Sequence, residues 1–156
     1  MSGWTGEVEV RIWRLPGQED VPLPSRQTEL AAGFDVHAAV AGPTPIPPGE
    51  VRLIPCGFAM ALPPGWEAQI RPRSGLASRF AVGMPNSPGT IDADYRGELK
   101  IPLINWGREP FIVTRGMRVG QMVVKPVPPV RLTVVSTADE LGSTARGEGG
   151  FGSTGH

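Results

Sequence analysis

The stretch from Gly83 to Trp106, GMPNSPGTIDADYRGELKIPLINW, carries the strongest local structural signals in this chain. It opens with a cluster of turn-forming residues at 85–89. Residues 98–101 then alternate polar and apolar side chains, a pattern typical of a half-buried strand. Residues 92–97 lie between these parts and contain two aspartates, a tyrosine and a second turn. We predict a β-hairpin with acidic residues at its bend.

The bend carries more chemical groups than a turn requires. Asp92 and Asp94 are two residues apart, so an extended strand would place both carboxylates on one face, whereas a turn need not. A carboxylate here can position or deprotonate a water molecule. An aspartate in a turn also commonly accepts a hydrogen bond from its own backbone. The only tyrosine of the chain, Tyr95, follows three residues after Asp92.

The overall composition indicates one all-β domain. The chain has 156 residues, of which 40% are hydrophobic, and its 21 glycines and 18 prolines separate short apolar runs. No apolar run approaches the ~20 residues of a membrane-spanning helix. A formal net charge of zero argues against broad binding to nucleic acid or membrane surfaces. A single cysteine, Cys56, excludes an internal disulfide framework, and no secretory signal is visible, so we expect a cytoplasmic protein.

The remaining chain is typical of strands joined by turns. Residues 31–41 are rich in alanine, but Gly33 and Gly42-Pro43 bound a segment that we interpret as a strand rather than a helix. Residues 74–80 lack proline and have helical spacing, which predicts one short helix. The predicted strands cover residues 7–15, 34–39, 51–55, 58–62, 66–70, 111–114, 119–124 and 131–136, with turns at 43–49 and 63–65.

Arginines precede the short predicted helix, in the sequence Arg71-Pro72-Arg73-Ser74-Gly75. The first turn of a helix has unpaired N–H groups and a positive dipole end, which attract anions. Ser74 also suits the N-cap position, which is a purely structural explanation. Two arginines exceed what capping requires, so a phosphate or other anion site is the favoured hypothesis.

Three further residues have ordinary explanations that stay open at this point. Asp35, after Gly33, has the same two interpretations as the aspartates of the bend. His37 is too isolated for a metal site or a catalytic triad, and we interpret it as a strand residue. Cys56 is interpreted as a small core residue.

The sequence changes character after Leu141, where GSTARGEGGFGSTGH contains one large apolar residue, Phe151. Such a segment cannot bury enough surface to order itself. It is either a frayed terminus or an arm that orders over a ligand. In the second case its N–H groups and hydroxyls suit phosphate oxygens, and Phe151 suits a flat ring.

Five segments, in order, resemble the motifs of the trimeric deoxyuridine triphosphatases (dUTPases). The resemblance runs from about Ala32 to the C-terminus, and the third motif matches almost letter for letter. Five motifs in order are far more specific than one. The matching segments are Ala32-Gly33-Phe34-Asp35-Val36, Arg73-Ser74-Gly75-Leu76-Ala77, residues 86–97, Arg118-Val119-Gly120-Gln121 and residues 146–155.

The resemblance implies a distorted β jelly roll, the dUTPase-like β-clip, with a flexible C-terminal arm and a homotrimer whose three active sites are shared between subunits. Residues 1–141 would form the jelly-roll domain and residues 142–156 a lid. The reaction would be hydrolysis of dUTP to dUMP and pyrophosphate by water attack on the α-phosphorus, which lowers dUTP and supplies dUMP for thymidylate synthesis. Mg²⁺ would be held mainly by the triphosphate and water, because this ion retains much of its hydration. No protein ligand set for the metal is visible in the sequence.

Roles for individual residues follow from the resemblance. Asp92 would bind the 3′-hydroxyl and orient or deprotonate the attacking water. Tyr95 would lie against the sugar and exclude a 2′-hydroxyl. Asp35 would lie behind the phosphate-binding residues, near the metal. The remaining implied contacts are Asn86, Thr90, Ile91 and Lys100 around uracil, Arg73, Ser74, Gly75 and Gln121 on the phosphates, and Arg146, Phe151, Gly152, Ser153 and Thr154 in the lid, with Phe151 stacked on uracil.

The chain departs from the family pattern at Met117, where an acid is usual, and at Gly120, where alanine is usual. Two alternative functions remain. A deoxycytidine triphosphate deaminase would need a glutamate after the aromatic residue of the third motif, where this chain has Arg96. A non-catalytic trimeric nucleotide-binding relative would be expected to lack Asp92 or the arm, and both are present.

Overall fold

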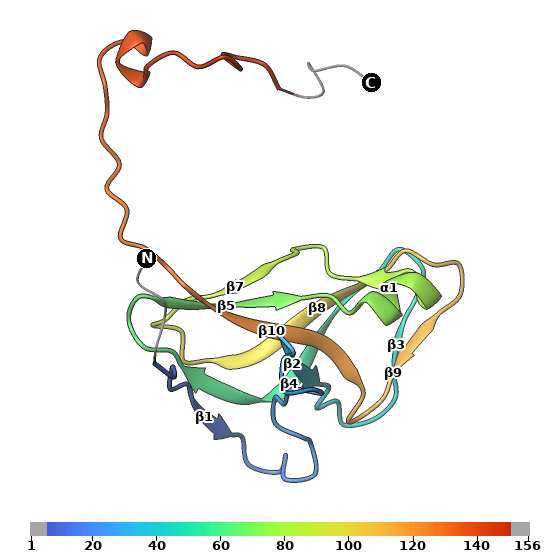
Figure 1. The fold of residues 1–156 in the computed structure, drawn as a ribbon. Helices are drawn as coiled ribbons and strands as arrows, with labels where there is room; N and C mark the ends of the chain where they lie inside the picture. Colours follow the sequence, from blue (N-terminus) through green and yellow to red (C-terminus); the bar gives the residue numbers. More distant parts are fainter. Residues whose placement is uncertain (1–5, 151–156) are drawn as a thin grey trace.

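The structure is a computed structural model that describes residues 6–150. Within this range the protein is mostly β, with one α-helix, and every strand pair is antiparallel. The strands form two four-stranded sheets, β1-β4-β8-β6 and β2-β10-β5-β7, and a small sheet, β3-β9 (Figure 1). The elements are β1 (Arg11–Arg14), β2 (Phe34–His37), β3 (Thr44–Ile46), β4 (Val51–Ala61), β5 (Trp66–Arg71), α1 (Ser74–Phe80), β6 (Val82–Gly83), β7 (Gly89–Ile91), β8 (Glu98–Asn105), β9 (Phe111–Val113), β10 (Arg118–Pro126) and a 3₁₀ turn, η1 (Ala138–Leu141). The predicted all-β class with one short helix is confirmed.

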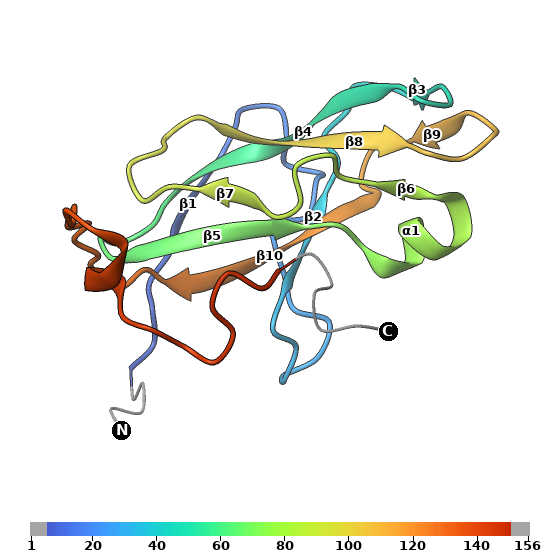
Figure 2. The same ribbon diagram turned by 90° about the horizontal axis from the view of Figure 1, so that it is seen from above.

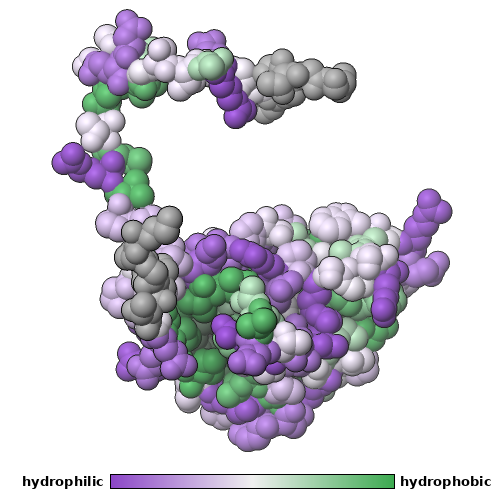
Figure 3. Space-filling model, in the orientation of Figure 1, coloured by the Kyte–Doolittle hydropathy of each residue, from purple (hydrophilic) through white to green (hydrophobic). Residues whose placement is uncertain are grey.

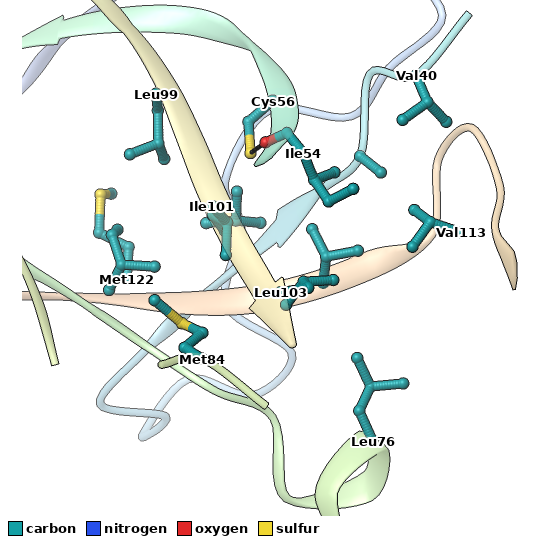
Figure 4. Close-up of a cluster of buried hydrophobic side chains, with 14 of the residues drawn as sticks. Val40, Ile54, Cys56, Leu76, Met84, Leu99, Ile101, Leu103, Val113 and Met122 are labelled. Carbon is teal, nitrogen blue, oxygen red and sulfur yellow. Dashed lines mark hydrogen bonds between the residues drawn. The ribbon is translucent and has the colours of Figure 1, made fainter. Parts of the chain in front are cut away.

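The core lies between the two large sheets. Strand β8 alternates strictly, and its Leu99, Ile101 and Leu103 are almost fully buried. In Figure 4 these side chains lie between residues of β4, such as Ile54, and Met122 of β10. The alternation read from residues 98–101 therefore identified the buried face of the central strand correctly. Cys56 is buried in the same cluster, as predicted, and burial raises the pKa of its thiol.

The predicted hairpin across residues 83–106 is wrong. Strand β7 pairs with β5 in the second sheet, whereas β8 pairs with β4 and β6 in the first. Residues 92–97, which we call the acid loop, therefore cross from one sheet to the other. The error has a physical reason, because a period of two identifies the buried face of a strand but not the strand beside it.

Strand β4 is continuous where two separate strands were predicted. Gly57 does not end it but forms a bulge, with a φ of 74° that favours glycine. A Cβ at this position would also lie 3.0 Å from the side chains of Ala39 and Gln18. Strand β1 is shorter than the predicted 7–15, and β3 lies inside the predicted turn at 43–49, where Pro45 of the short edge strand misled the interpretation.

Residues 131–136 do not form the predicted strand. Their sequence suits a strand, but no neighbouring strand pairs with them within residues 6–150. Leu132 and Val134 are 91% and 97% exposed. Figures 1 and 2 show this part of the chain leaving the body after β10 and running to η1. Strand-forming residues make a β-strand only where a neighbouring strand supplies backbone hydrogen-bond partners, and no described strand does so here.

No helix in the described part of the chain is long and apolar enough to cross a membrane.

Candidate active site

The first part of the candidate site is an interlocked group that we call the arginine cluster: Asp35, Arg73, Arg118 and Gln121. The Asp35 carboxylate lies between two guanidinium groups, with Oδ2 3.1 Å from Arg118 Nη1 and Oδ1 3.7 Å from Arg73 Nε. Arg73 Nη1 also donates a hydrogen bond to the Arg118 carbonyl at 3.2 Å. Only 14% of the Asp35 side chain is exposed. The charge of Asp35 is therefore compensated, and the two arginines are held side by side.

Gln121 joins this cluster through the sheet. It lies on β10 opposite Asp35 of β2 and Arg71 of β5, and its Nε2 donates to the Pro72 carbonyl at 3.2 Å. A Cβ on Gly33 would lie 2.7 Å from Gln121 Oε1. Glycine at position 33 thus allows the amide to reach the loop that leads to Arg73.

Helix α1 begins immediately after Arg73. Arg73 itself is the N-cap residue and forms no side-chain capping bond, while Ser74 is the first helical residue. The interpretation of Ser74 as an N-cap is therefore wrong. Ser74 is exposed, and its N–H and that of Gly75 belong to the first turn, whose amides lack intrahelical acceptors. These groups lie next to the arginines that were predicted to bind an anion.

The sequence analysis gave no site role to Arg118, a member of the cluster, and none to His37, which lies beside it. Arg118 was assigned to a motif but given no role, although it forms the shorter ion pair with Asp35. His37 lies opposite Arg118 across the sheet and is 8% exposed, and its Nδ1 has no hydrogen-bond partner within residues 6–150. Burial lowers the pKa of His37, which the Asp35 charge opposes and both arginines reinforce. The i, i+2 spacing of Asp35 and His37 was the available signal, since it places both on one face of a strand.

The second part of the candidate site is the acid loop, residues 92–97. The Tyr95 N–H donates to the Asp92 carbonyl at 3.1 Å, and the Tyr95 phenol donates to the Glu98 carbonyl at 2.9 Å. A Cβ on Gly97 would overlap the phenol ring, so glycine there lets the ring lie against the chain. Arg96 Nη1 donates to the carbonyls of Ala93 and Tyr95 at 2.6 and 2.9 Å. The loop is thus fixed by its own backbone.

Asp92 differs from Asp35 in having no compensating partner. Its residue is exposed, and its side chain forms no hydrogen bond or ion pair with any part of the chain that the structure describes. The alternative in which this turn aspartate bonds its own backbone is therefore not observed. The residue lines a cavity of about 620 Å³ together with Trp66, Glu67 and residues 127–130. An unpaired carboxylate beside a cavity is available to a water molecule or a ligand.

The other residues expected around a base lie near the two ends of the acid loop. Asn86 approaches Gly89 at the start of β7, where its Nδ2 is 3.4 Å from the position of a Gly89 Cβ. Thr90 is exposed and Ile91 is half-buried on the same strand. Lys100 is exposed on β8, and its Nζ lies 3.9 Å from Glu98 Oε2. These side chains are accessible to a ligand.

One chain does not bring the acid loop and the arginine cluster together. The separation of the two parts can be measured along strand β5. Gln121 pairs with Arg71 at one end of this strand, and Ile91 pairs with Ala68 further along it. Asp92 continues beyond Ile91, so about four residues of strand separate it from Arg71, or on the order of 13 Å. Within one chain the acid loop and the arginine cluster are therefore two separate parts of the candidate site.

Of the predicted lid residues, the structure describes only Arg146. Arg146 is exposed, and its Nε donates to the Gly149 carbonyl at 2.7 Å. The other predicted lid residues, Phe151, Gly152, Ser153 and Thr154, lie outside the described residues.

The dUTPase family model matches residues 19–155 of this chain. The chain belongs to the dUTPase family. It is 52% identical over 150 residues to the deoxyuridine 5′-triphosphate nucleotidohydrolase of Maricaulis maris (strain MCS10), covering 95% of this chain and 97% of that protein. It is 50% identical over 148 residues to the enzyme of the same name from Rhizobium etli (strain CIAT 652), covering 94% of this chain and 93% of that protein.

Solved structures show the same fold in bacteriophage members of the family. The dUTPase of Staphylococcus bacteriophage 80alpha, as a mutant with dUpNHpp, superposes with a TM-score of 0.79 at 23% identity, covering 95% of this chain and 99% of that one. A mutant dUTPase from phage phi11 of S. aureus, described with a structural Mg(II) ion, gives 0.74 at 21% identity, covering 84% and 99%. At this level of identity the likeness concerns the fold.

Proposed function

We propose that this protein hydrolyses dUTP to dUMP and pyrophosphate. The observation that carries the proposal is the contrast between its two motif aspartates. Asp35 is neutralised by two arginines, whereas Asp92 is exposed and has no partner within residues 6–150. Phosphoryl transfer requires charge-neutralising groups on the phosphates and a carboxylate that positions water, and the chain supplies one of each kind.

In the proposed reaction Asp92 accepts a proton from a water molecule that attacks the α-phosphorus. A bond forms between the water oxygen and phosphorus, and the bond to the α–β bridging oxygen breaks, so that pyrophosphate leaves with the electron pair. Arg73, the first-turn amides of Ser74 and Gly75, and Gln121 bind the phosphate oxygens. These groups stabilise charge where it develops.

The residues present are compatible with Mg²⁺ bound through the substrate. Within residues 6–150 there is no group of three or more His, Cys, Asp and Glu side chains that could hold a metal ion. Mg²⁺ is usually bound by one or two carboxylates together with substrate phosphates and water, and Asp35 lies beside the phosphate-binding groups. When bound to the triphosphate, the ion would neutralise charge on the phosphate oxygens.

The nucleoside would lie at the acid loop. Tyr95 would pack against deoxyribose and leave no room for a 2′-hydroxyl, and Asp92 would also bind the 3′-hydroxyl. Asn86, Thr90, Ile91 and Lys100 would frame uracil. The exposure of these residues and the fixed phenol of Tyr95 support this arrangement.

We further propose a homotrimer in which neighbouring subunits complete each site. The ~13 Å between Asp92 and the arginine cluster along β5 supports the sharing of sites. The outward face of the first sheet supports contact between subunits, because it exposes Leu53 (59%) next to Pro102, and Trp106 (60%) packed on Gly83. Exposed apolar surface of this kind marks protein interfaces.

A second area, whose mixed polar and apolar lining includes Glu7 and Arg26, lies beside the N-terminal strand β1. It is a hollow of about 550 Å³, lined by residues that include Phe34, Trp66 and Met122, and Figure 3 shows apolar side chains there with a polar rim. The exposed Leu132 and Val134 of the extended segment offer matching apolar side chains. We assign both surfaces to contacts between copies of this chain.

The proposed fold is a distorted jelly roll of residues 1–141 with residues 142–156 as a lid. Arg146, Phe151, Gly152, Ser153 and Thr154 would close over the bound nucleotide, with Phe151 on uracil. Closure would exclude water other than the attacking molecule.

We propose a cytoplasmic location and no nucleic-acid or membrane partner.

A single incubation tests the proposed function. The protein is incubated with dUTP, dCTP or dTTP in magnesium buffer, and pyrophosphate and ammonia are followed together. We expect pyrophosphate from dUTP alone and no ammonia. Ammonia from dCTP would identify a deaminase. Absence of both products, from a folded trimer, would identify a binding protein without this activity.

A further inference from the structure

Glu98 joins two parts of the molecule that meet at the base of the acid loop. Its side chain reaches β4, where Oε1 accepts a hydrogen bond from the Gly57 N–H at 3.0 Å. Its own carbonyl accepts the hydrogen bond from the Tyr95 phenol at 2.9 Å. The same residue therefore contacts the bulge of one strand and the aromatic ring of the loop.

The bulge explains why a side chain is needed at this point. Pro55 pairs with Lys100 and Ala59 pairs with Glu98, so three residues of β4 lie opposite one residue of β8. Gly57, in the middle of these three, is buried. A buried N–H without an acceptor is costly, and the carboxylate of Glu98 supplies the acceptor.

The bulge is itself fixed by a hydrogen bond to another part of the chain. The Gly57 carbonyl accepts a hydrogen bond from the Leu15 N–H at 2.9 Å, which ties it to the end of β1. The hydrogen bond from Gly57 thus fixes the Glu98 side chain against β4. This side chain is 22% exposed. Lys100 Nζ, 3.9 Å from Oε2, approaches the other carboxylate oxygen.

The Tyr95 ring is held against this anchored residue. Among the described residues its phenol forms one hydrogen bond, which it donates to the Glu98 carbonyl. Gly97, which has no side chain, lies against the ring. Ala93 is half-buried and packs against the core, whereas Asp92 and residues 94–97 are exposed. A change in the position of Glu98 therefore moves the acceptor that fixes the ring.

We propose that Glu98 is a positioning residue for Tyr95 and so sets the preference for deoxyribonucleotides over ribonucleotides. This inference rests on the proposed function, in which Tyr95 packs against the sugar. Glu98 does not touch the substrate in this role. It acts through its bond to Gly57 on one side and its carbonyl on the other.

Selectivity is the first measurement, as the ratio of kcat/KM for dUTP to that for UTP. Glu98→Ala removes the acceptor of the Gly57 N–H, and we expect the ratio to fall about tenfold, the scale of one charge-assisted hydrogen bond. Glu98→Gln keeps an oxygen acceptor of the same reach and should stay within about threefold of the unmodified protein. Glu50→Ala is the matched control, because Glu50 is an exposed acid that pairs with Arg52 and directly precedes β4, the strand that contains Gly57. It should leave the ratio unchanged.

The second measurement does not depend on activity. Tyr95 is the only tyrosine of the chain, so labelling with 3-fluorotyrosine gives one ¹⁹F resonance that reports this ring. The resonance should move or broaden in Glu98→Ala and not in Glu98→Gln or Glu50→Ala. In a Tyr95→Phe background, which removes the phenol, Glu98→Ala should change the selectivity ratio less than it does alone.

The outcomes separate this inference from the proposed function. If the unmodified protein does not hydrolyse dUTP, the proposed function is rejected. If the ¹⁹F resonance does not move in Glu98→Ala, the positioning of Tyr95 by Glu98 is rejected, whether or not the protein is active. A moved resonance with an unchanged dUTP-to-UTP ratio overturns the role in sugar selection. If Glu98→Ala does not fold, Glu98→Asp takes its place, because its shorter side chain keeps the charge but not the reach to Gly57.

Discussion

The arginine cluster and the acid loop lie toward opposite ends of β5 and are built in opposite ways. In the cluster, Asp35 is shielded and tied to Arg73 and Arg118 by side-chain contacts across two strands. In the loop, hydrogen bonds between its own residues fix the backbone, while no residue in the described range pairs with the Asp92 carboxylate. The charge of Asp35 is thus compensated within one chain, whereas the charge of Asp92 has no compensating group among residues 6–150.

This difference separates binding from chemistry. Ion pairs among its own members fix the cluster before any ligand arrives, so changes there should act mainly on binding. The unpaired carboxylate of the loop gains its role only in the reaction, so a change there should act mainly on turnover.

The largest effect is expected from Asp92→Asn, which keeps shape and removes the base. We expect turnover of dUTP to fall at least about a thousandfold, because a positioned general base contributes roughly 10²–10⁴ and the water also loses its orientation. Binding of dUpNHpp, measured by calorimetry, should stay within a few-fold. Substantial turnover by this variant would show that Asp92 is not the base.

Removal of the arm should have the next largest effect. A chain ending at residue 145 lacks Arg146 and Phe151, and its turnover should fall about a hundredfold as the closed state and its phosphate contacts are lost. The trimer should persist in sedimentation experiments. Full activity in the truncated trimer would remove the lid role.

A smaller effect is expected from Asp35→Asn. Loss of the charge between Arg73 and Arg118 lets the two guanidinium groups repel each other, and we expect KM for dUTP to rise about tenfold with a smaller change in kcat. Asp20→Asn is the matched control, because Asp20 is also paired with an arginine, Arg115, at 2.6 Å but lies outside both halves of the site. A kcat effect without a KM effect in Asp35→Asn would assign Asp35 to the chemistry instead.

The smallest effect concerns stability in acid. The hydrogen bond from Arg115 lowers the pKa of Asp20 from 3.8 to about 2. Because the folded-state pKa is the lower one, this pair stabilises the protein above about pH 4 and loses its contribution as the pH falls toward 2. Asp20→Asn should therefore lower Tm at neutral pH, and the Tm difference should shrink in melts recorded near pH 3. An undiminished difference there would exclude the ion pair as its cause.

Local sequence patterns predicted the fold class and the buried face of β8, because alternation and turn residues depend on neighbours in the chain. They did not predict that β7 and β8 belong to different sheets, or that residues 131–136 pair with no strand in the described part of the chain. Both are properties of pairing between distant segments.

The candidate site shows the same limit. Gly33, Asp35 and Gln121 were found through motifs. The close approach of Gln121 explains glycine at position 33, and the ion pairs with Arg73 and Arg118 explain the acid at position 35. The contribution of Arg118 and the burial of His37 depend on the register between β2 and β10. The i, i+2 spacing of Asp35 and His37 indicates a shared strand face but not which residues lie opposite it. The separation of Asp92 from Arg73 likewise follows from the register of β5 with its two neighbours.

A subunit-mixing experiment is the most direct test of a shared dUTP-hydrolysing site. Asp92→Asn and Arg73→Ala subunits are unfolded together in equal amounts, refolded, and assayed at a dUTP concentration well below the raised KM of Arg73→Ala, where each variant alone has little activity. If each site takes Asp92 from one subunit and Arg73 from another, random trimers should recover about a quarter of the unmodified activity, because one site in four receives both intact residues. If mixing restores nothing while mixed trimers are present, both residues act within one chain, and the shared site is contradicted.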